Sequence, residues 1–341
     1  MSISSDLSPY HEDVAGEVIP GKLQTNGWQL VRRILAIAYF TVLGVITVVD
    51  GVPTARTKLM FIIVVGLAIH SIGRGQRKLF RVVLDWLPFT AVLMVYDISR
   101  GLATSVDMPL HESDIVTAEK WLFGGNIPTV WLQDHFYDPG VVHWYDAAAT
   151  LVYTTHFLAT PVLAAVLWIR NRQLWVAYIS RVIALAFAGL VTYVLFPEAP
   201  PWMAARDHLI DPVSRLSARG WIWLHAGNVH ELLENAQADG SNPVAAMPSL
   251  HTAFATLVAL FLVARIRSRL RYLLWLYPAA MGTVLVYTGE HYVLDILAGV
   301  AYALAIHYAV GRWEAARRRR REVLTPPVSA RADAPDAVLA S

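Results

Sequence analysis

The sequence predicts an all-α protein, a polytopic membrane helix bundle with about eight spans. Of its residues, 56% are hydrophobic and 16% are charged, and the mean hydropathy is +0.44. This balance lies outside the range of most soluble proteins and is typical of chains that cross a bilayer several times. The sequence contains no cysteine, which excludes disulfides, thiol catalysis and cysteine metal sites.

Apolar runs give the predicted spans in chain order. The third run is interrupted by Asp85 and Pro88. The spans are predicted at residues 31–49, 58–73, 80–99, 142–169, 174–196, 249–265, 271–289 and 291–311. The chain is accordingly divided into a disordered tail at 1–29, a two-span extension at 30–79, a six-span core at 80–313 and a C-terminal segment at 314–341 that is basic and then disordered.

The distribution of Lys and Arg predicts the orientation. These residues are concentrated in the loops on the side of the N-terminus, so both termini are expected to be cytoplasmic in the plasma (inner) membrane, with the opposite loops extracytoplasmic. About 30 residues precede the first run and no small-x-small site follows it, so we expect a retained span rather than a cleaved signal peptide. The basic run Arg317–Arg321 is expected to contact anionic headgroups, and no nucleic-acid partner is predicted.

Two long segments fall on the predicted outer side. Residues 101–141 combine aromatic side chains with scattered acids, which is typical of short amphipathic helices at the membrane interface. They would form either an aromatic belt or a substrate lid. Residues 197–247 begin with Pro197, Pro200 and Pro201, which end the fifth span and fix an irregular backbone.

Two short motifs, Met247–His251 and Gly289–Asp295, stand at the starts of apolar stretches. The chain between them makes two limbs of roughly 17 residues, each spanning about 26 Å, close to a hydrocarbon core of about 30 Å. Such a hairpin returns the chain to the side from which it started. His251 and His291 are therefore predicted to meet at one membrane surface.

The spacing of polar residues in these motifs indicates their chemistry. His291 and Asp295 are four residues apart, so on a helix they share one face and the carboxylate can hold one imidazole nitrogen. The other nitrogen is then available as a nucleophile or base, and His251 is the complementary acid. Ser249, with the backbone N–H groups of its helix start, is predicted to cradle an anion. Two histidines beside an anion site favour phosphoryl transfer.

These motifs resemble those of a known family. Pro248–His251 and Tyr287–His291, with the following Asp295, resemble the second and third signature motifs of the type-2 phosphatidic acid phosphatase superfamily. Phe196–Trp202 (FPEAPPW) resembles the first-motif region of its inositol phosphorylceramide synthase branch. The resemblance covers roughly residues 80–313 and implies a six-span phosphatase-type core preceded by two further spans.

The resemblance implies a metal-independent reaction without a cofactor on an extracytoplasmic phosphoester. By analogy, His291 attacks phosphorus to give a phosphohistidine-type intermediate, Asp295 orients His291, and His251 protonates the departing oxygen. The donor is a lipid phosphoester, and the acceptor is a lipid, a sugar or water. We favour headgroup transfer over hydrolysis because of the FPEAPPW segment and the absence of phosphatase-type cations.

Several positions depart from the family's phosphatases. The usual Arg six residues ahead of the third-motif His is Leu285 here, and the proline segment offers Glu198 instead of a cation. A positive charge must still offset the charge of the transition state, and Arg206 and Arg100 are the outward candidates. Arg100 alternatively pairs with Asp97. Glu198 either activates an acceptor hydroxyl or is a surface carboxylate.

One further histidine and two other classes of function remain open. His156 lies inside the fourth predicted span, where a polar group is costly, and it either lines the site or bonds a neighbouring helix. A zinc hydrolase would use His251, His291 and Asp295 as ligands, and inactivation by a chelator would identify it. A non-catalytic lipid transporter would bind phosphate without reacting, although simple binding would favour Arg or Lys at these positions.

Overall fold

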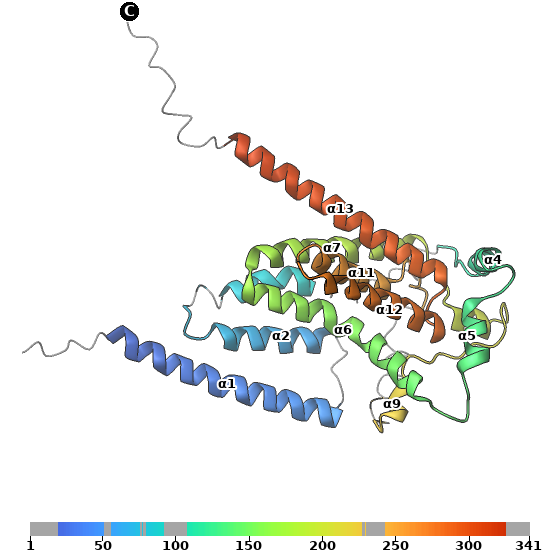
Figure 1. Cartoon of the computed structure of the whole chain (residues 1–341), viewed down its shortest axis with the longest axis horizontal. Coiled ribbons are helices and arrows are strands. Elements are labelled where there is room, and N and C mark those ends of the chain that lie inside the picture. Colours follow the sequence, from blue (N-terminus) through green and yellow to red (C-terminus); the bar gives the residue numbers. More distant parts are fainter. Residues whose placement is uncertain are drawn as a thin grey trace, which may run out of the picture.

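The computed structural model describes residues 20–50, 56–75, 77, 80–91, 108–226, 229 and 243–324 (Figure 1). Within these ranges every regular element is a helix, and the only β-type pairings are isolated bridges, His111 with Glu198 and Glu198 with Ala245. The predicted all-α fold is therefore confirmed. Arg100 and Asp97 lie outside the described residues.

The helices follow the order of the predicted apolar runs and loops. The long helices and their partners are α1 (Pro20–Asp50), α2 (Arg56–Ser71), α6 (Trp144–Arg170), α7 (Arg172–Leu195), α11 (Leu250–Val263), η1 (Arg269–Trp275), α12 (Leu276–Tyr287) and α13 (Val293–Leu324), with a further helical segment at residues 80–91. The short helices are α4 (Ser113–Leu122), α5 (Pro128–Phe136), α8 (Pro201–Arg206) and α9 (Gly220–Trp223).

Four of these helices are long and apolar enough to cross a membrane: 27–47, 144–170, 172–195 and 293–321. Helices α2 and α11 are apolar but shorter. The predicted seventh span differs most from the structure, because it begins as the 3-10 helix η1 and leaves only 12 α-helical residues in α12. The number of eight spans stays a prediction.

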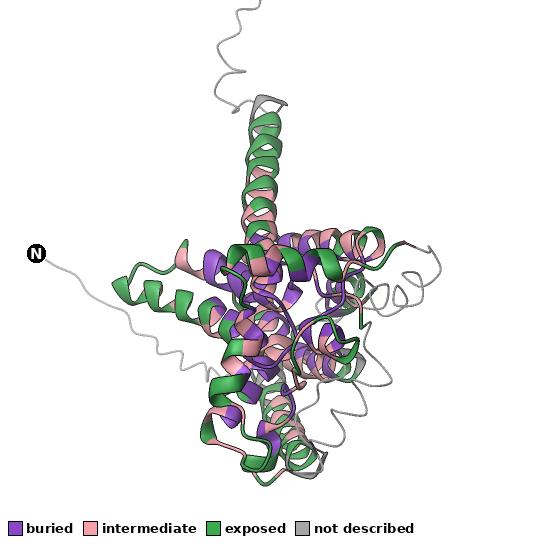
Figure 2. Cartoon of the chain, turned by 90° about the vertical axis from the view of Figure 1, so that its right-hand side faces the viewer, coloured by how far each residue is buried: buried purple, intermediate pink, exposed green. Residues whose placement is uncertain are grey.

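Helix α11 is the centre of the bundle. It packs against α6, α7, α12 and α13 (Figure 1), and its residues 252–261 are buried except Phe254. A helix that is apolar on all sides must be covered by other helices or by lipid, and here neighbouring helices cover α11. Buried residues accordingly gather in the middle of the bundle, while the far end of α13 stands clear of it and is mostly exposed (Figure 2).

A glycine sets the distance between α11 and α13. A Cβ added at Gly299 would lie 2.4 Å from the backbone oxygen of Ser249. No side chain fits in that space, so the start of α11 can rest directly on α13 only with glycine at this position. The contact positions the two histidine motifs relative to each other.

Charged residues inside the apolar runs are paired. Asp85, which interrupts the third run, accepts hydrogen bonds from Arg172 at 2.6 and 2.8 Å and from Trp168 at 2.9 Å. Arg181 of α7 forms a two-pronged ion pair with Glu314 of α13 at 2.9 and 3.0 Å. Pairing lowers the cost of a charge in apolar surroundings.

The ends of the chain differ from the predicted tails. Helix α13 continues through the basic run to Leu324, and α1 begins at Pro20, inside the segment predicted to be a tail. In Figure 1 the last turn of α13 and the first turn of α1 both lie toward the left, away from α4 and α5. Residues 1–19 and 325–341 lie outside the described part of the chain.

Candidate active site

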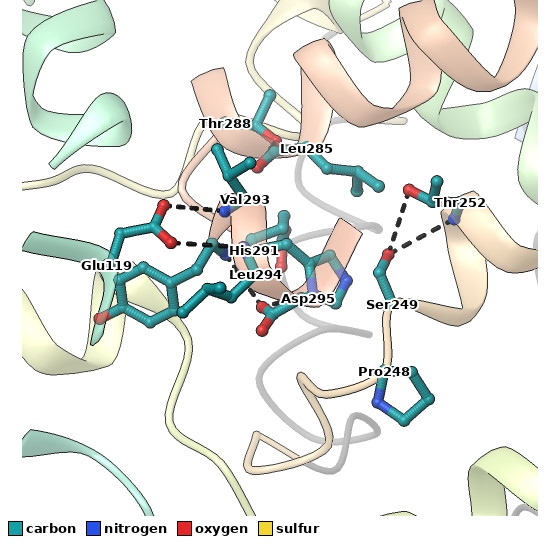
Figure 3. Close-up of polar contacts among 12 residues, drawn as sticks. Glu119, Pro248, Ser249, Thr252, Leu285, Thr288, His291, Val293, Leu294 and Asp295 are labelled. Atoms are coloured by element: carbon teal, nitrogen blue, oxygen red, sulfur yellow. Dashed lines mark hydrogen bonds and ion pairs between the residues drawn. The ribbon is translucent and has the colours of Figure 1, made fainter. Parts of the chain in front are cut away.

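The predicted contact between His291 and Asp295 is present, but its local structure differs from the prediction. Helix α13 begins at Val293, so His291 precedes the helix instead of standing on it. Asp295 is the third helical residue, and its Oδ2 accepts the backbone N–H of Tyr292 at 2.9 Å. This is the acidic half of a capping box. The same oxygen lies 3.1 Å from Nδ1 of His291 (Figure 3).

His251 reaches the same place from α11. Ser249 caps this helix, because its side chain accepts the N–H of Thr252. The backbone N–H of Ser249 donates to the backbone oxygen of Asp295 at 3.0 Å, which joins the starts of α11 and α13. The ring centroids of His251 and His291 are 5.6 Å apart and the planes are inclined by 64°. Rings at this distance are in edge contact. A phosphorus that both histidines reach therefore lies beside the pair, not between the rings.

Helix α6 contacts the ring of His251. The ring centroid of His156 is 4.0 Å from that of His251, and the ring of Tyr153 stacks on it at 5.1 Å. The structure thus places His156 against His251, which agrees with the alternative in which His156 lines the site. Tyr153 was not predicted, although it lies three residues before His156 and therefore on the same helix face.

A carboxylate from α4 fixes the start of α13. The side chain of Glu119 is fully buried, and its oxygens accept the backbone N–H groups of Val293 at 2.9 Å and Leu294 at 3.3 Å (Figure 3). A negative charge there also suits the positive end of the helix dipole. Burial raises the pKa of Glu119, while these two hydrogen bonds oppose the rise. Sequence reasoning did not find this residue.

The turn before His291 is fixed by three separate segments. Gly289 has a φ of +76°, which favours glycine. Its carbonyl accepts the N–H of Trp202 at 3.2 Å, and the neighbouring carbonyl of Thr288 accepts the N–H of Leu216 at 3.0 Å. Gln133 of α5 donates to the backbone oxygen of Tyr287 at 2.8 Å. Both segments predicted to lie on the outer side, 101–141 and 197–247, therefore contact the third motif directly.

Glu198, in the proline segment, is fully buried. Its backbone N–H donates to Val244 at 2.8 Å, and the next N–H, that of Ala199, donates to His111 at 3.0 Å. Within the described residues no N–H or O–H donor reaches either carboxyl oxygen. Burial, and after it the nearby charge of Asp295, raises the pKa of Glu198 far above its ordinary value.

A cation is paired with the residue that precedes His291. Arg215 donates through Nε and Nη2 to the carboxylate of Glu290 at 2.8 and 3.0 Å, and Ser217 donates to the same carboxylate at 2.5 Å. The guanidinium carbon of Arg215 is 5.2 Å from the ring centroid of Trp202. Because Glu290 directly precedes His291, this ion pair places Arg215 at the edge of the site.

Arg206 and Ser249, both predicted to bind phosphate, have other contacts in the structure. Arg206 has a side chain that is 60% exposed and forms a two-pronged ion pair with Asp207 at 2.8 and 2.9 Å. Ser249 is fully buried, and both its backbone N–H and its hydroxyl oxygen are engaged in the contacts described above. Among the described residues, no group of three or more His, Asp or Glu side chains is arranged to hold a metal ion.

The fold and the site together define a helical protein of membrane type, with a His–His–Asp centre at the starts of two of its helices. The chain belongs to the PAP2 superfamily, whose family model matches residues 114–309. The match runs from α4 into α13 and so contains all three residues of that centre.

The chain is also similar to the phosphoinositol dihydroceramide synthase of Bacteroides thetaiotaomicron. The two are 24% identical over 261 residues, which is 73% of this chain and 82% of the relative. No solved structure matches the chain. Family and relative confirm the resemblance to the inositol phosphorylceramide synthase-like branch, and they support a lipid phosphotransferase or phosphatase.

Proposed function

We propose that this protein is an integral-membrane phosphotransferase that moves a phosphorylated headgroup between lipid substrates through a phosphohistidine-type intermediate. The observation that carries the proposal is the pair of imidazoles, His251 and His291, at 5.6 Å, with Asp295 on Nδ1 of His291. A group that only binds phosphate has no need of a histidine oriented by a carboxylate.

The first half of the reaction follows from this geometry. Asp295 keeps the ring proton of His291 on Nδ1, so the lone pair of Nε2 is available to attack phosphorus. As the N–P bond forms, the bond from phosphorus to the oxygen of the donor lipid breaks. His251, protonated at this stage, gives its proton to that oxygen. The neutral lipid alcohol leaves, and Asp295 stabilises the positive charge on the phosphorylated ring.

The second half reverses these roles. His251, now neutral, removes the proton from the acceptor hydroxyl, whose oxygen attacks phosphorus. The N–P bond breaks, and its electrons return to Nε2 of His291. The product is the phosphodiester of the acceptor, or a free phosphorylated headgroup when the acceptor is water. His156 and Tyr153, which flank His251, are proposed to confine that ring and line the acceptor side.

We propose Arg215 as the cation that offsets the charge on the transferred group. Its Nη1 takes no part in the hydrogen bonds to Glu290, and we assign this N–H group to a phosphate oxygen. Tyr153, whose ring stacks on His251, is close enough to interact electrostatically with the Arg215 guanidinium. Arg206 and Arg100 remain alternative candidates, but Arg206 is already bound by Asp207 at the surface.

The substrates and the location belong to the same proposal. The donor is a lipid phosphoester and the acceptor a lipid, a sugar or water, without a metal or an organic cofactor. The relative is named for phosphoinositol and dihydroceramide, so a phosphoinositol lipid is the first donor to test. We place the protein in the plasma (inner) membrane with cytoplasmic termini and an extracytoplasmic site, as the distribution of Lys and Arg predicts.

The test is a panel of phospholipids labelled at phosphorus, offered to purified protein with and without a long-chain alcohol acceptor. Label in a new lipid supports transfer, and label in a water-soluble headgroup with no lipid product identifies a phosphatase. His291→Ala should abolish both products. Bound lipid that never reacts, in wild type as in the variant, would contradict an enzyme and favour transport.

A further inference from the structure

The buried carboxyls behind His291 pose an electrostatic problem. Asp295 and Glu198 are both completely buried, each with 0% of its surface accessible to solvent. Within the described part of the chain, three of their carboxyl oxygens receive no hydrogen bond from an N–H or O–H donor. These are both oxygens of Glu198 and Oδ1 of Asp295. The side chains of Glu198 and Asp295 are in direct contact. Two ionised carboxylates in such surroundings repel strongly and lack compensation. One proton shared between them removes both penalties.

The contacts decide which carboxyl keeps that proton. Asp295 already has two partners on Oδ2, the N–H of Tyr292 and Nδ1 of His291, and it lies in the first turn of α13, where a negative charge is favoured. Glu198 has no comparable partner. The acidic groups that face it come from α4, namely Asp114 and Glu119, and from α13, namely Asp295. A negative charge is therefore compensated by hydrogen bonds at Asp295 and uncompensated at Glu198.

We propose that Glu198 is a neutral carboxylic acid that donates its hydrogen bond to Oδ1 of Asp295, and so serves as a positioning residue for the Asp295–His291 pair. The effect of Glu198 on catalysis rests on the proposed function, whereas its protonation does not. Glu198 touches no reacting atom. It fixes the rotation of the Asp295 carboxylate, so that Oδ2 stays on Nδ1 of His291 throughout the reaction.

The backbone of the proline segment explains how the acid stays in place. Pro197 and Pro200 restrict the chain on both sides of Glu198. Backbone bridges join this segment to His111 on one side and to Ala245 on the other. These contacts fix the backbone at Glu198, and its side chain is fully buried from that position. The proline segment therefore delivers an acid to the Asp295 carboxylate, on the oxygen that His291 does not contact.

Three variants and two readouts test the proposal. Glu198→Gln keeps a neutral hydrogen-bond donor, whereas Glu198→Met keeps the volume and removes the donor. Glu112→Gln is the control, because it removes a different acid, one that is only half-buried and faces Asp207. We expect Glu198→Gln to stay within about threefold of the wild-type kcat, and Glu198→Met to lose more than about tenfold in kcat with KM nearly unchanged, as expected for a lost interaction that acts on the transition state.

Infrared spectroscopy reads the proton without any substrate. At neutral pH the wild type should show the carbonyl band of a protonated carboxylic acid, retained in Glu112→Gln and reduced in Glu198→Gln. An unchanged band in Glu198→Gln would show that Glu198 is ionised and would overturn the proposal, and so would equal activity of the Met and Gln variants. If neither the wild type nor any variant transfers phosphate, the proposed function fails, but the infrared band still tests whether Glu198 is protonated. The infrared band also provides that test if Glu198→Met does not fold.

Discussion

Replacing Glu198 by Gln should stabilise the protein at neutral pH and leave its stability unchanged in acid. The folded state keeps a proton on Glu198, because burial and the nearby charge of Asp295 raise its pKa above the ordinary value of 4.5. The unfolded chain releases that proton once the pH exceeds this value. Linkage then lowers the stability of the wild type, relative to the variant, by roughly 1.4 kcal/mol for each pH unit.

The size of the effect is large enough to measure. Between pH 5.5 and 7.5 the gain of Glu198→Gln should grow by roughly 3 kcal/mol, and below about pH 4.5 the two proteins should unfold alike because both states are then protonated. Glu119, whose pKa is also raised, is present in both proteins and cancels in the difference. The assay is unfolding in detergent micelles across this pH range. Parallel stability curves for wild type and variant would refute the argument that Glu198 is buried as a neutral acid.

Three further substitutions test the rest of the site. Glu119→Gln leaves one amide oxygen for two N–H groups at the start of α13 and should cost about 1 kcal/mol of stability, measured by thermal unfolding, with a drop in kcat; full activity would contradict its positioning role. Gly299→Ala should destabilise by about 1–3 kcal/mol because its Cβ has no space, whereas Gly44→Ala, with no atom within 4 Å, should be neutral or slightly stabilising in the same assay. Arg215→Lys should lower kcat/KM by about 10–100-fold in steady-state kinetics, since lysine cannot bridge Glu290 and phosphate with a planar fork; a larger loss in Arg206→Ala would assign the phosphate to that residue instead.

The meeting of the two histidines could be predicted because it depends mainly on the length of the chain between them. The limbs between the motifs have similar lengths, so His251 and His291 return to one end of the bundle whatever the details of the turn. The prediction missed that η1 replaces part of the second limb and that α13 begins after His291. Helix starts depend on capping contacts, and here the cap is Asp295 itself together with Glu119, which lies 174 residues before Val293.

The supporting residues were harder to predict, for different reasons. Glu119 carries one local signal, since it follows Ile115 by four residues and so shares the buried face of α4. Arg215 carries none, because its loop has no period and its place depends on Glu290 far along the chain. Glu198 was expected to activate an acceptor or to lie at the surface. Its complete burial follows from backbone bridges to segments that a sequence pattern does not connect.

The most direct test of the central claim is to trap the phosphorylated protein and locate the label. Wild-type protein is mixed with a phosphorus-labelled lipid donor, quenched in alkali, digested and mapped by mass spectrometry. The account predicts label on the peptide that contains His291, none in His291→Ala, and loss of the label when an acceptor alcohol is added. Label on His251, or product formed by His291→Ala at the wild-type rate, would contradict it.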